Sequence, residues 1–139
     1  MSLLVGTWSL VEWTATVDDR VQRPFGGDVA GLLTYTDDGR MWAALMRKDR
    51  EHVAASSFAA ALAAERAAAS AGYLNYAGTY TEKDDWVIHH VELALMPNWV
   101  GDDQERLVTW IGEDLELSTP PEQGRSGALI VNRLRWTRI

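Results

Sequence analysis

Two adjacent histidines, His89 and His90, interrupt the apolar stretch WVIHHVELAL that spans residues 86–95. In a β-strand, successive side chains point to opposite faces, so only one of the two histidines can face an interior. Histidine titrates near neutral pH and is the side chain that enzymes use most often as a general acid or base. The pattern therefore predicts a site that contains one histidine, and it argues against joint chelation of a metal ion by the pair.

The other residues give little support for a metal or another cofactor. The chain has no cysteine, and the third histidine, His52, is not part of an HExxH sequence. The G-x-S-x-G, P-loop and G-x-G-x-x-G motifs are also absent, so serine-hydrolase chemistry and nucleotide binding lack support. We expect neither a metal site nor a cofactor.

The preferred catalytic constellation consists of His90, Glu92 and Arg106. His90 and Glu92 share one face of their strand, and Arg106 lies early in the next predicted strand, beyond the turn PNWVG at residues 97–101. Antiparallel pairing places such residues side by side. In an interior, the histidine would transfer a proton, the carboxylate would orient it, and the guanidinium would stabilise developing negative charge.

Two alternatives stay open for this strand. On an outward face the same three residues would form a cross-strand salt-bridge ladder, and His89 would then face inward. The alternate positions around His89 are the more apolar, which favours His89, whereas a ligand cavity needs a few polar groups, which leaves His90 possible. We take His90 as the preferred inward histidine and keep His89 as the second candidate for the acid/base role.

Aromatic and methionine side chains recur on several predicted strands and are candidates for ligand contact. Aromatic rings offer large contact areas together with hydroxyl or N–H groups. Trp99 is the strongest candidate, because a tryptophan at a turn can border the mouth of a cavity, and core packing is the alternative for the others. The candidate ligand-binding residues are Tyr35, Met41, Trp42, Tyr76, Tyr80, Trp99 and Trp110.

The composition is that of an acidic chain of one-domain size. Its 139 residues include 13 Lys and Arg against 20 Asp and Glu, which gives a formal charge of −7. We expect one domain over residues 1–139, large enough to bury a core or to enclose one cavity. Nucleic acids and membranes are not expected as partners, because both bind concentrated positive charge. Without a signal-peptide pattern or a long apolar run, we expect a cytoplasmic protein of bacterial type.

Short strands at hairpin spacing must position these residues. About eight to ten are expected, and the clearest hairpin has Asp37-Asp38-Gly39 between two apolar runs. The alanine-rich stretch at residues 51–71 lacks glycine and proline and precedes Gly72, so it predicts an inserted helix. Its narrow apolar face suits a lid or plug, or else a surface helix. A long antiparallel meander most simply closes into an up-and-down barrel, because closure removes exposed strand edges.

Several short motifs together resemble the bacterial and fungal lipocalin-like domain family. They follow one another over nearly the whole chain, and the pairing of HHVE with PNWVG is the most specific of them. The resemblance implies an all-β, calycin-type antiparallel barrel around a small-molecule cavity, with the tryptophan of the GTW motif, Trp8, as a plug at its base. The motifs are Gly6-Thr7-Trp8, Pro24-Phe25-Gly26, residues 33–41, Gly78-Thr79-Tyr80, His89-His90-Val91-Glu92, residues 97–101, Gln104 with Arg106, and residues 117–121.

Three functions follow as expectations. The preferred one is binding of a small apolar or aromatic molecule in the cavity of the barrel. The resemblance also covers cofactor-independent cyclases and isomerases of natural-product, polyketide-like pathways, in which His90 or His89 would be the acid/base and Arg106 would stabilise an oxyanion. The third is a structural or partner-binding barrel whose interior is filled by its own side chains.

Overall fold

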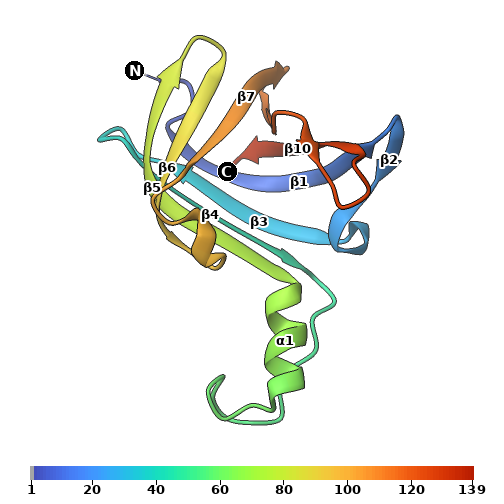
Figure 1. Cartoon of the computed structure of the whole chain (residues 1–139). Helices are drawn as coiled ribbons and strands as arrows, with labels where there is room; N and C mark the ends of the chain where they lie inside the picture. The colour runs from blue at the N-terminus through green and yellow to red at the C-terminus, as the bar shows by residue number, and fades with distance from the viewer. Residues whose placement is uncertain (1) are drawn as a thin grey trace.

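The computed structural model describes residues 2–139 and consists mainly of antiparallel strands, with one short α-helix below them (Figure 1). Two single turns of 3-10 helix, Pro24–Gly27 and Pro97–Trp99, connect strands. The strands are β1 (Gly6–Val17), β2 (Arg20–Gln22), β3 (Val29–Tyr35), β4 (Arg40–Arg47), β5 (Tyr73–Lys83), β6 (Trp86–Ala94), β7 (Asp103–Ile111), β8 (Asp114–Ser118), β9 (Glu122–Gln123) and β10 (Leu129–Arg138).

Eight of the strands close into a barrel. The sheet has the order β2-β1-β3-β4-β5-β6-β7-β8-β10-β9, and β1 also pairs with β10. The ring is therefore β1-β3-β4-β5-β6-β7-β8-β10, and the short strands β2 and β9 extend from β1 and β10. All pairings are antiparallel, which confirms the predicted all-β, up-and-down barrel.

The hairpin between β3 and β4 forms where Asp37-Asp38-Gly39 predicts it. Gly39 has a φ of 90°, a conformation that costs glycine little because it has no Cβ. The N–H of Thr36 donates to the carbonyl of Arg40 at 2.8 Å and closes the turn. The two flanking strands then pair in register from Tyr35 with Met41 to Val29 with Arg47.

Trp8, near the start of β1, is part of the packed core. The ring is fully buried, and its Nε1–H donates to the carbonyl of Leu4 at 2.9 Å. Trp110 packs against it with ring centroids 5.9 Å apart, and the guanidinium of Arg138 lies 4.2 Å from the ring centroid. Met41 and Leu115, neither exposed, continue the core beside Trp8.

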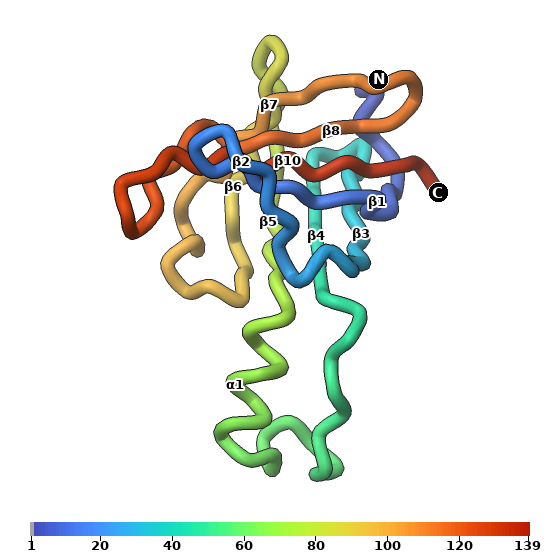
Figure 2. Tube along the Cα trace, turned by 90° about the vertical axis from the view of Figure 1, so that its right-hand side faces the viewer, coloured from blue at the N-terminus to red at the C-terminus, as the bar shows by residue number. Residues whose placement is uncertain are grey.

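The chain leaves the barrel between β4 and β5 and returns after a long excursion, residues 48–72, which projects away from the strands (Figure 2). Within it, α1 spans only Ala63–Ala71, and residues 51–62 are irregular, with turns and bends over 54–61, so the predicted helix over 51–71 is wrong in its first half. Phe58 and Leu62, the largest apolar side chains of this half, are 55% and 71% exposed, so they form no buried apolar face that would stabilise a helix. The carboxylate of Glu65 instead accepts hydrogen bonds from the N–H groups of Leu62 and Ala54.

Candidate functional site

β6 carries His89, and not His90, into the barrel. Val87, His89 and Val91 are at most 4% exposed. A β-bulge follows, because Gly78 pairs with Val91 and Ala77 pairs with Leu93, which leaves Glu92 without a partner across the ladder. Beyond the bulge the alternation of faces reverses, and Leu93 is 68% exposed.

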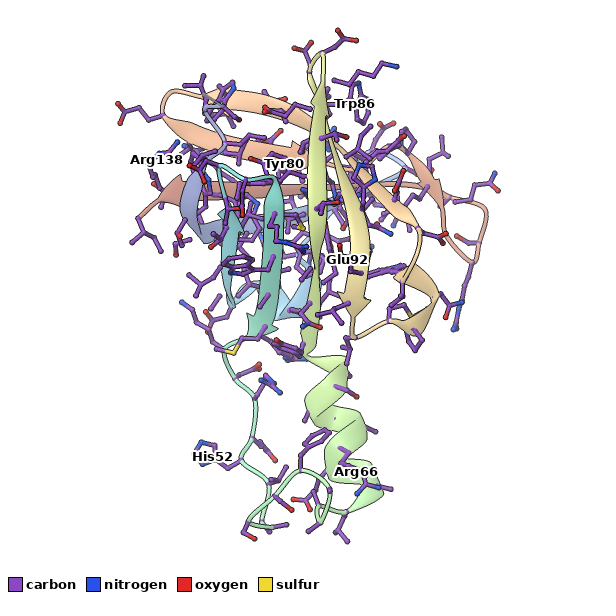
Figure 3. All side chains as sticks on the ribbon, turned by 90° about the vertical axis from the view of Figure 1, so that its left-hand side faces the viewer. His52, Arg66, Tyr80, Trp86, Glu92 and Arg138 are labelled. Carbon is purple, nitrogen blue, oxygen red and sulfur yellow. The ribbon has the colours of Figure 1, made fainter. Side chains whose placement is uncertain are left out.

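The preference for an inward His90 is therefore wrong. His90 lies outside, where Nδ1 is 2.8 Å from the Asp103 carboxylate and Nε2 is 3.1 Å from the Thr81 hydroxyl. Glu92 also lies on the outer surface and forms an ion pair with Arg40 at 3.2 Å (Figure 3). The predicted constellation of His90, Glu92 and Arg106 is thus not assembled. The apolar residues on either side of His89 outweigh the polar character of the histidine itself, because burying them removes more apolar area from water.

Arg106 does lie on the same inner face as His89. In the pairing of β6 with β7, Gln104 is opposite His89 and Arg106 is opposite Val87. The Nη2 of Arg106 donates to the Gln104 side-chain oxygen at 3.2 Å, and its Nη1 donates to the carbonyl of Glu105 at 2.8 Å. The cross-strand neighbour of the inward histidine is therefore an amide, with the guanidinium one step further along β7.

These residues border a cavity of about 370 Å³ inside the barrel. The volume lies in the lower part of the range for small-molecule sites. The interior is thus not filled by its own side chains, and no residue of the excursion contributes to the lining, so the excursion is not a lid over this cavity. The lining consists of Trp13, Leu33, Ala43, Leu45, Leu74, Tyr76, His89, Trp99, Gln104, Arg106, Leu117, Thr119, Glu122, Asn132, Leu134 and Trp136.

His89 joins two tyrosine hydroxyls in a buried hydrogen-bonded chain. Its Nε2 is 2.6 Å from the Tyr35 hydroxyl, and its Nδ1 is 2.7 Å from the Tyr76 hydroxyl. Tyr35 is 1% exposed and lies behind the histidine, whereas Tyr76 lines the cavity. The chain therefore runs from the core to the cavity surface.

Burial keeps the imidazole of His89 neutral. It lowers the pKa of His89 to about 3, and the positive charge of Arg106 acts in the same direction. Burial raises the pKa of Tyr76, and the positive charge of Arg106 partly opposes that rise. Both phenols and the imidazole are consequently uncharged at neutral pH, and Arg106 supplies the positive charge.

Counting donors and acceptors assigns the proton on His89. Within residues 2–139, the hydroxyl of Tyr35 has His89 Nε2 as its one hydrogen-bond partner, so its buried O–H is satisfied only if Nε2 accepts. The neutral imidazole then carries its proton on Nδ1 and donates to the oxygen of Tyr76. The O–H of Tyr76 is left to donate into the cavity.

The other aromatic candidates divide between the cavity, the core and the outer surface. Tyr76 and Trp99 line the cavity, with ring centroids 5.8 Å apart. Tyr35 and Met41 are buried outside the cavity lining, and Tyr80 packs on Tyr35 while donating to the carbonyl of Thr36 at 2.8 Å.

Two candidates do not face the cavity. Trp42 is 48% exposed on the outer face, because it alternates with the buried Met41 and Ala43 on β4. Trp110 shares the inward parity of Arg106 on β7 but packs against Trp8, is 39% exposed and lies outside the cavity lining. Neither tryptophan is therefore positioned to contact a ligand in this cavity, contrary to the expectation from the sequence.

The sequence interpretation missed several residues that line the cavity. Trp13, Asn132 and Trp136 come from β1 and β10, and only barrel closure brings these two strands together with β6. Gln104 had a usable signal, because it stands two residues before Arg106 on the same strand face. Trp13 and Asn132 had no such signal, because only the folded barrel brings them together. There, Trp13 Nε1 donates to the Asn132 side-chain oxygen at 2.9 Å, across 119 positions of sequence.

No group of three or more metal-ligating side chains lies within residues 2–139 in an arrangement suited to a metal ion. His52 lies on the excursion, well away from the barrel (Figure 3). None of the helices in the described part of the chain has the length and apolar character needed to cross a membrane.

Comparison with known proteins places this fold and cavity in a family. The family model described as a lipocalin-like domain matches residues 5–139. A curated relative from Aspergillus oryzae, the 4'-hydroxy-3'-methoxypropiophenone carrier protein, is 35% identical over 107 residues, which cover 71% of this chain and 96% of the relative. No solved structure matches the chain. On the family match over nearly its whole length, this chain belongs to the lipocalin-like domain family.

Proposed function

We propose that this protein binds and carries a small aromatic, oxygen-bearing molecule in its barrel cavity. The observation that carries the proposal is an unfilled interior of about 370 Å³ in which aromatic side chains surround a small polar cluster. Trp13, Tyr76 and Trp99 offer ring faces and edges, and Gln104 and Arg106 offer hydrogen bonds at one side.

The relative supports the ligand class. Its name describes a carrier of an aryl ketone that also bears a hydroxyl and a methoxy group, and the match covers 96% of its length. A molecule of this class has one aromatic ring and a few oxygen atoms, which suits a cavity at the lower end of the usual volume range. We therefore extend the ligand class, and not the particular molecule, to this chain.

Binding of 4'-hydroxy-3'-methoxypropiophenone, used as a probe, tests the proposal. Isothermal titration calorimetry measures the affinity, and tryptophan fluorescence reports the site because three tryptophans line the cavity: Trp13, Trp99 and Trp136. We expect saturable binding of one probe molecule with a change in tryptophan emission.

Two neighbouring alanines on β4 provide a variant that blocks the cavity and a matched control variant. Ala43 is 5% exposed and lines the cavity, whereas the side chain of Ala44 alternates to the outer face. Ala43→Phe is expected to abolish probe binding by filling the cavity, and Ala44→Phe to leave it within about twofold. Ala43→Leu is the milder substitute if Ala43→Phe does not fold. Equal binding by the folded Ala43 and Ala44 variants would place the probe elsewhere and refute the proposal.

Acid/base catalysis on such a ligand is the second candidate function. The chain of Tyr35, His89 and Tyr76 favours it, because a neutral imidazole between two phenols can pass a proton by changing its tautomer. Tyr76 would donate its O–H to the carbonyl oxygen of the ligand, Arg106 would stabilise the enolate oxygen as it forms, and a base from the solvent would take the proton from the neighbouring carbon.

Proton exchange next to the ketone of the probe distinguishes the two functions. In D₂O, NMR follows loss of the probe signal at the carbon next to the carbonyl. A catalyst accelerates this exchange, and Tyr76→Phe lowers the rate by about 10²-fold or more, whereas Tyr80→Phe does not. A carrier binds the probe and leaves exchange at the buffer rate.

A further inference from the structure

The polar groups of the cavity are arranged so that donors, and not acceptors, remain for a ligand. The side-chain oxygens of Gln104 and Asn132 already accept hydrogen bonds from Arg106 and from Trp13. Because both of those partners can only donate, the amide NH₂ groups of Gln104 and Asn132 are fixed as the remaining hydrogen-bonding groups. In the described part of the chain, neither NH₂ group has a hydrogen-bond partner.

Trp136 carries a donor that is unpaired although it is buried. This residue lines the cavity and is 2% exposed, and its Nε1–H has no hydrogen-bond partner within residues 2–139. This nitrogen has almost no accessible surface, so a ligand in the cavity does not reach it, and it is not counted among the donors for the ligand. The O–H of Tyr76, left free by the proton assignment on His89, is the further donor at the cavity surface.

Arg106 gives the cavity a positive charge with no carboxylate paired to it. None of the ion pairs formed by residues 2–139 includes Arg106, which donates to the neutral oxygens of Gln104 and Glu105 and also lies beside the Tyr76 hydroxyl. His89 is neutral, as are Tyr35 and Tyr76. Glu122 is the one acidic side chain in the lining, and it is exposed at the edge of the cavity on β9.

We infer that the cavity binds an aromatic oxyanion, such as the phenolate of a hydroxyaryl ketone, with its charged oxygen beside Arg106 and the free O–H of Tyr76. This inference rests on the proposed function and specifies the ionisation state of the ligand. An anionic oxygen accepts several charge-assisted hydrogen bonds at once, whereas a neutral phenol brings one more donor to a site that already has too many. The exposed Glu122 is the acceptor that a neutral phenol would use instead.

The acid dissociation of a bound phenol measures this preference directly. Phenolates absorb at longer wavelength than phenols, so a spectrophotometric pH titration of 4'-hydroxy-3'-methoxypropiophenone gives its pKa free and in the presence of saturating protein. A tenfold preference for the anion lowers the pKa of the bound probe by about one unit, and the measured affinity then rises with pH until the free probe is fully ionised.

Three comparisons isolate the source of the effect. Arg106→Gln removes the positive charge and is expected to abolish the shift, while Arg40→Gln removes an arginine on the outer surface and is expected to keep it. The methyl ether of the probe, which cannot ionise, is expected to bind at least about tenfold more weakly above the pKa of the free probe, with no rise in affinity as the pH increases.

The possible outcomes separate this inference from the proposed function. A lowered pKa that depends on Arg106 supports both. A probe that binds in the cavity with an unchanged or raised pKa, or a shift that survives Arg106→Gln, overturns the inference and leaves the carrier function standing. Absence of probe binding in calorimetry overturns both.

Discussion

At the scale of single residues, His89 makes folding sensitive to mild acid. Its pKa is lowered from 6.5 to about 3 by burial, so the unfolded chain binds a proton at His89 that the folded chain does not. Its contribution to stability is fully present above pH 6.5 and is lost as the pH falls from there towards 3. Within that window the free energy of unfolding should fall by up to about 1.4 kcal/mol per pH unit because of this group.

Replacing His89 by glutamine tests this directly. The Gln side chain can still bond to both tyrosine hydroxyls but does not titrate, so His89→Gln should flatten the dependence of unfolding free energy on pH between about pH 5 and about pH 7, measured by urea denaturation. His90→Gln removes the outer histidine and serves as the control. Identical slopes for wild type and His89→Gln would show that the imidazole is not held neutral in the fold.

The sequence narrows the buried histidine to two positions but does not decide between them by polarity. Val87 and Val91 point to His89, and that alternation is correct. In the sequence, the alternating apolar residues continue to Leu93 and Leu95. The bulge at Glu92, however, exchanges the inward and outward positions of the chain beyond it and exposes both leucines. A bulge depends on how the partner strand is aligned, so it is not visible in β6 alone.

At the scale of elements, Gly78 fixes how β5 meets β6. A Cβ at this position would lie 1.8 Å from the carbonyl oxygen of His90, a backbone atom that cannot move aside alone. Gly78→Ala should therefore lower the free energy of unfolding by about 3 kcal/mol or more. In the fraction of the variant that still folds, the hydrogen bond between His89 and Tyr76 should be misaligned.

Thermal unfolding and probe binding check the effect of Gly78→Ala. Gly124→Ala is the matched control, because its Cβ would meet chiefly the end of the Ile130 side chain. A stability of Gly78→Ala equal to that of the control would contradict the close approach of β5 to β6.

The excursion should be dispensable for the barrel and its cavity. The N–H of Arg47 donates to the carbonyl of Gly72 at 3.0 Å, so the two ends are already paired as in a hairpin. Replacing residues 48–71 by Asn-Gly, the sequence preferred for a two-residue hairpin turn, should leave probe affinity within about twofold. Calorimetry and circular dichroism measure the outcome, and a loss of affinity of about tenfold or more would mean that the excursion reaches the ligand.

Alanine content alone predicts the helix of the excursion correctly only from Ala63 onwards. Helix propensity is a weak preference, and a short helix in water needs packing or capping to persist. The carboxylate of Glu65 accepts the N–H of Leu62 and so caps the N-terminus of α1, while the Ser57 hydroxyl accepts the N–H of Ala60 in a local turn. In both contacts a side-chain oxygen accepts a backbone N–H group of a nearby residue. The spacing of residue types in the sequence does not show which of these hydrogen bonds form.

At the scale of the whole molecule, stability and binding belong to different parts of the barrel. Trp8 is fully buried in the packed core and lies outside the cavity lining. Trp8→Phe removes the hydrogen bond to Leu4 and part of the packed ring, so it should cost about 2 kcal/mol of unfolding free energy. Probe affinity of the folded variant should stay within about twofold of wild type, as measured by calorimetry. A parallel loss of affinity would mean that Trp8 shapes the cavity.

The architecture is predictable because the residues that mark each strand are neighbours in the sequence. Barrel closure is then the simplest way to pair the backbone N–H and C=O groups of ten short antiparallel strands. The cavity is less predictable because it is made by strands distant in sequence. Trp13 and Asn132 meet only through the pairing of β1 with β10, and neither residue is conspicuous within its own strand.

The packed core around Trp8 bears on how an occupant would be exchanged. If it leaves the cavity open on one side only, an incoming molecule cannot displace the resident one from behind, and release precedes replacement. Under the proposed carrier function, transfer to an acceptor should then proceed at a rate set by dissociation, independent of acceptor concentration. Residence time would in that case be the property on which delivery depends.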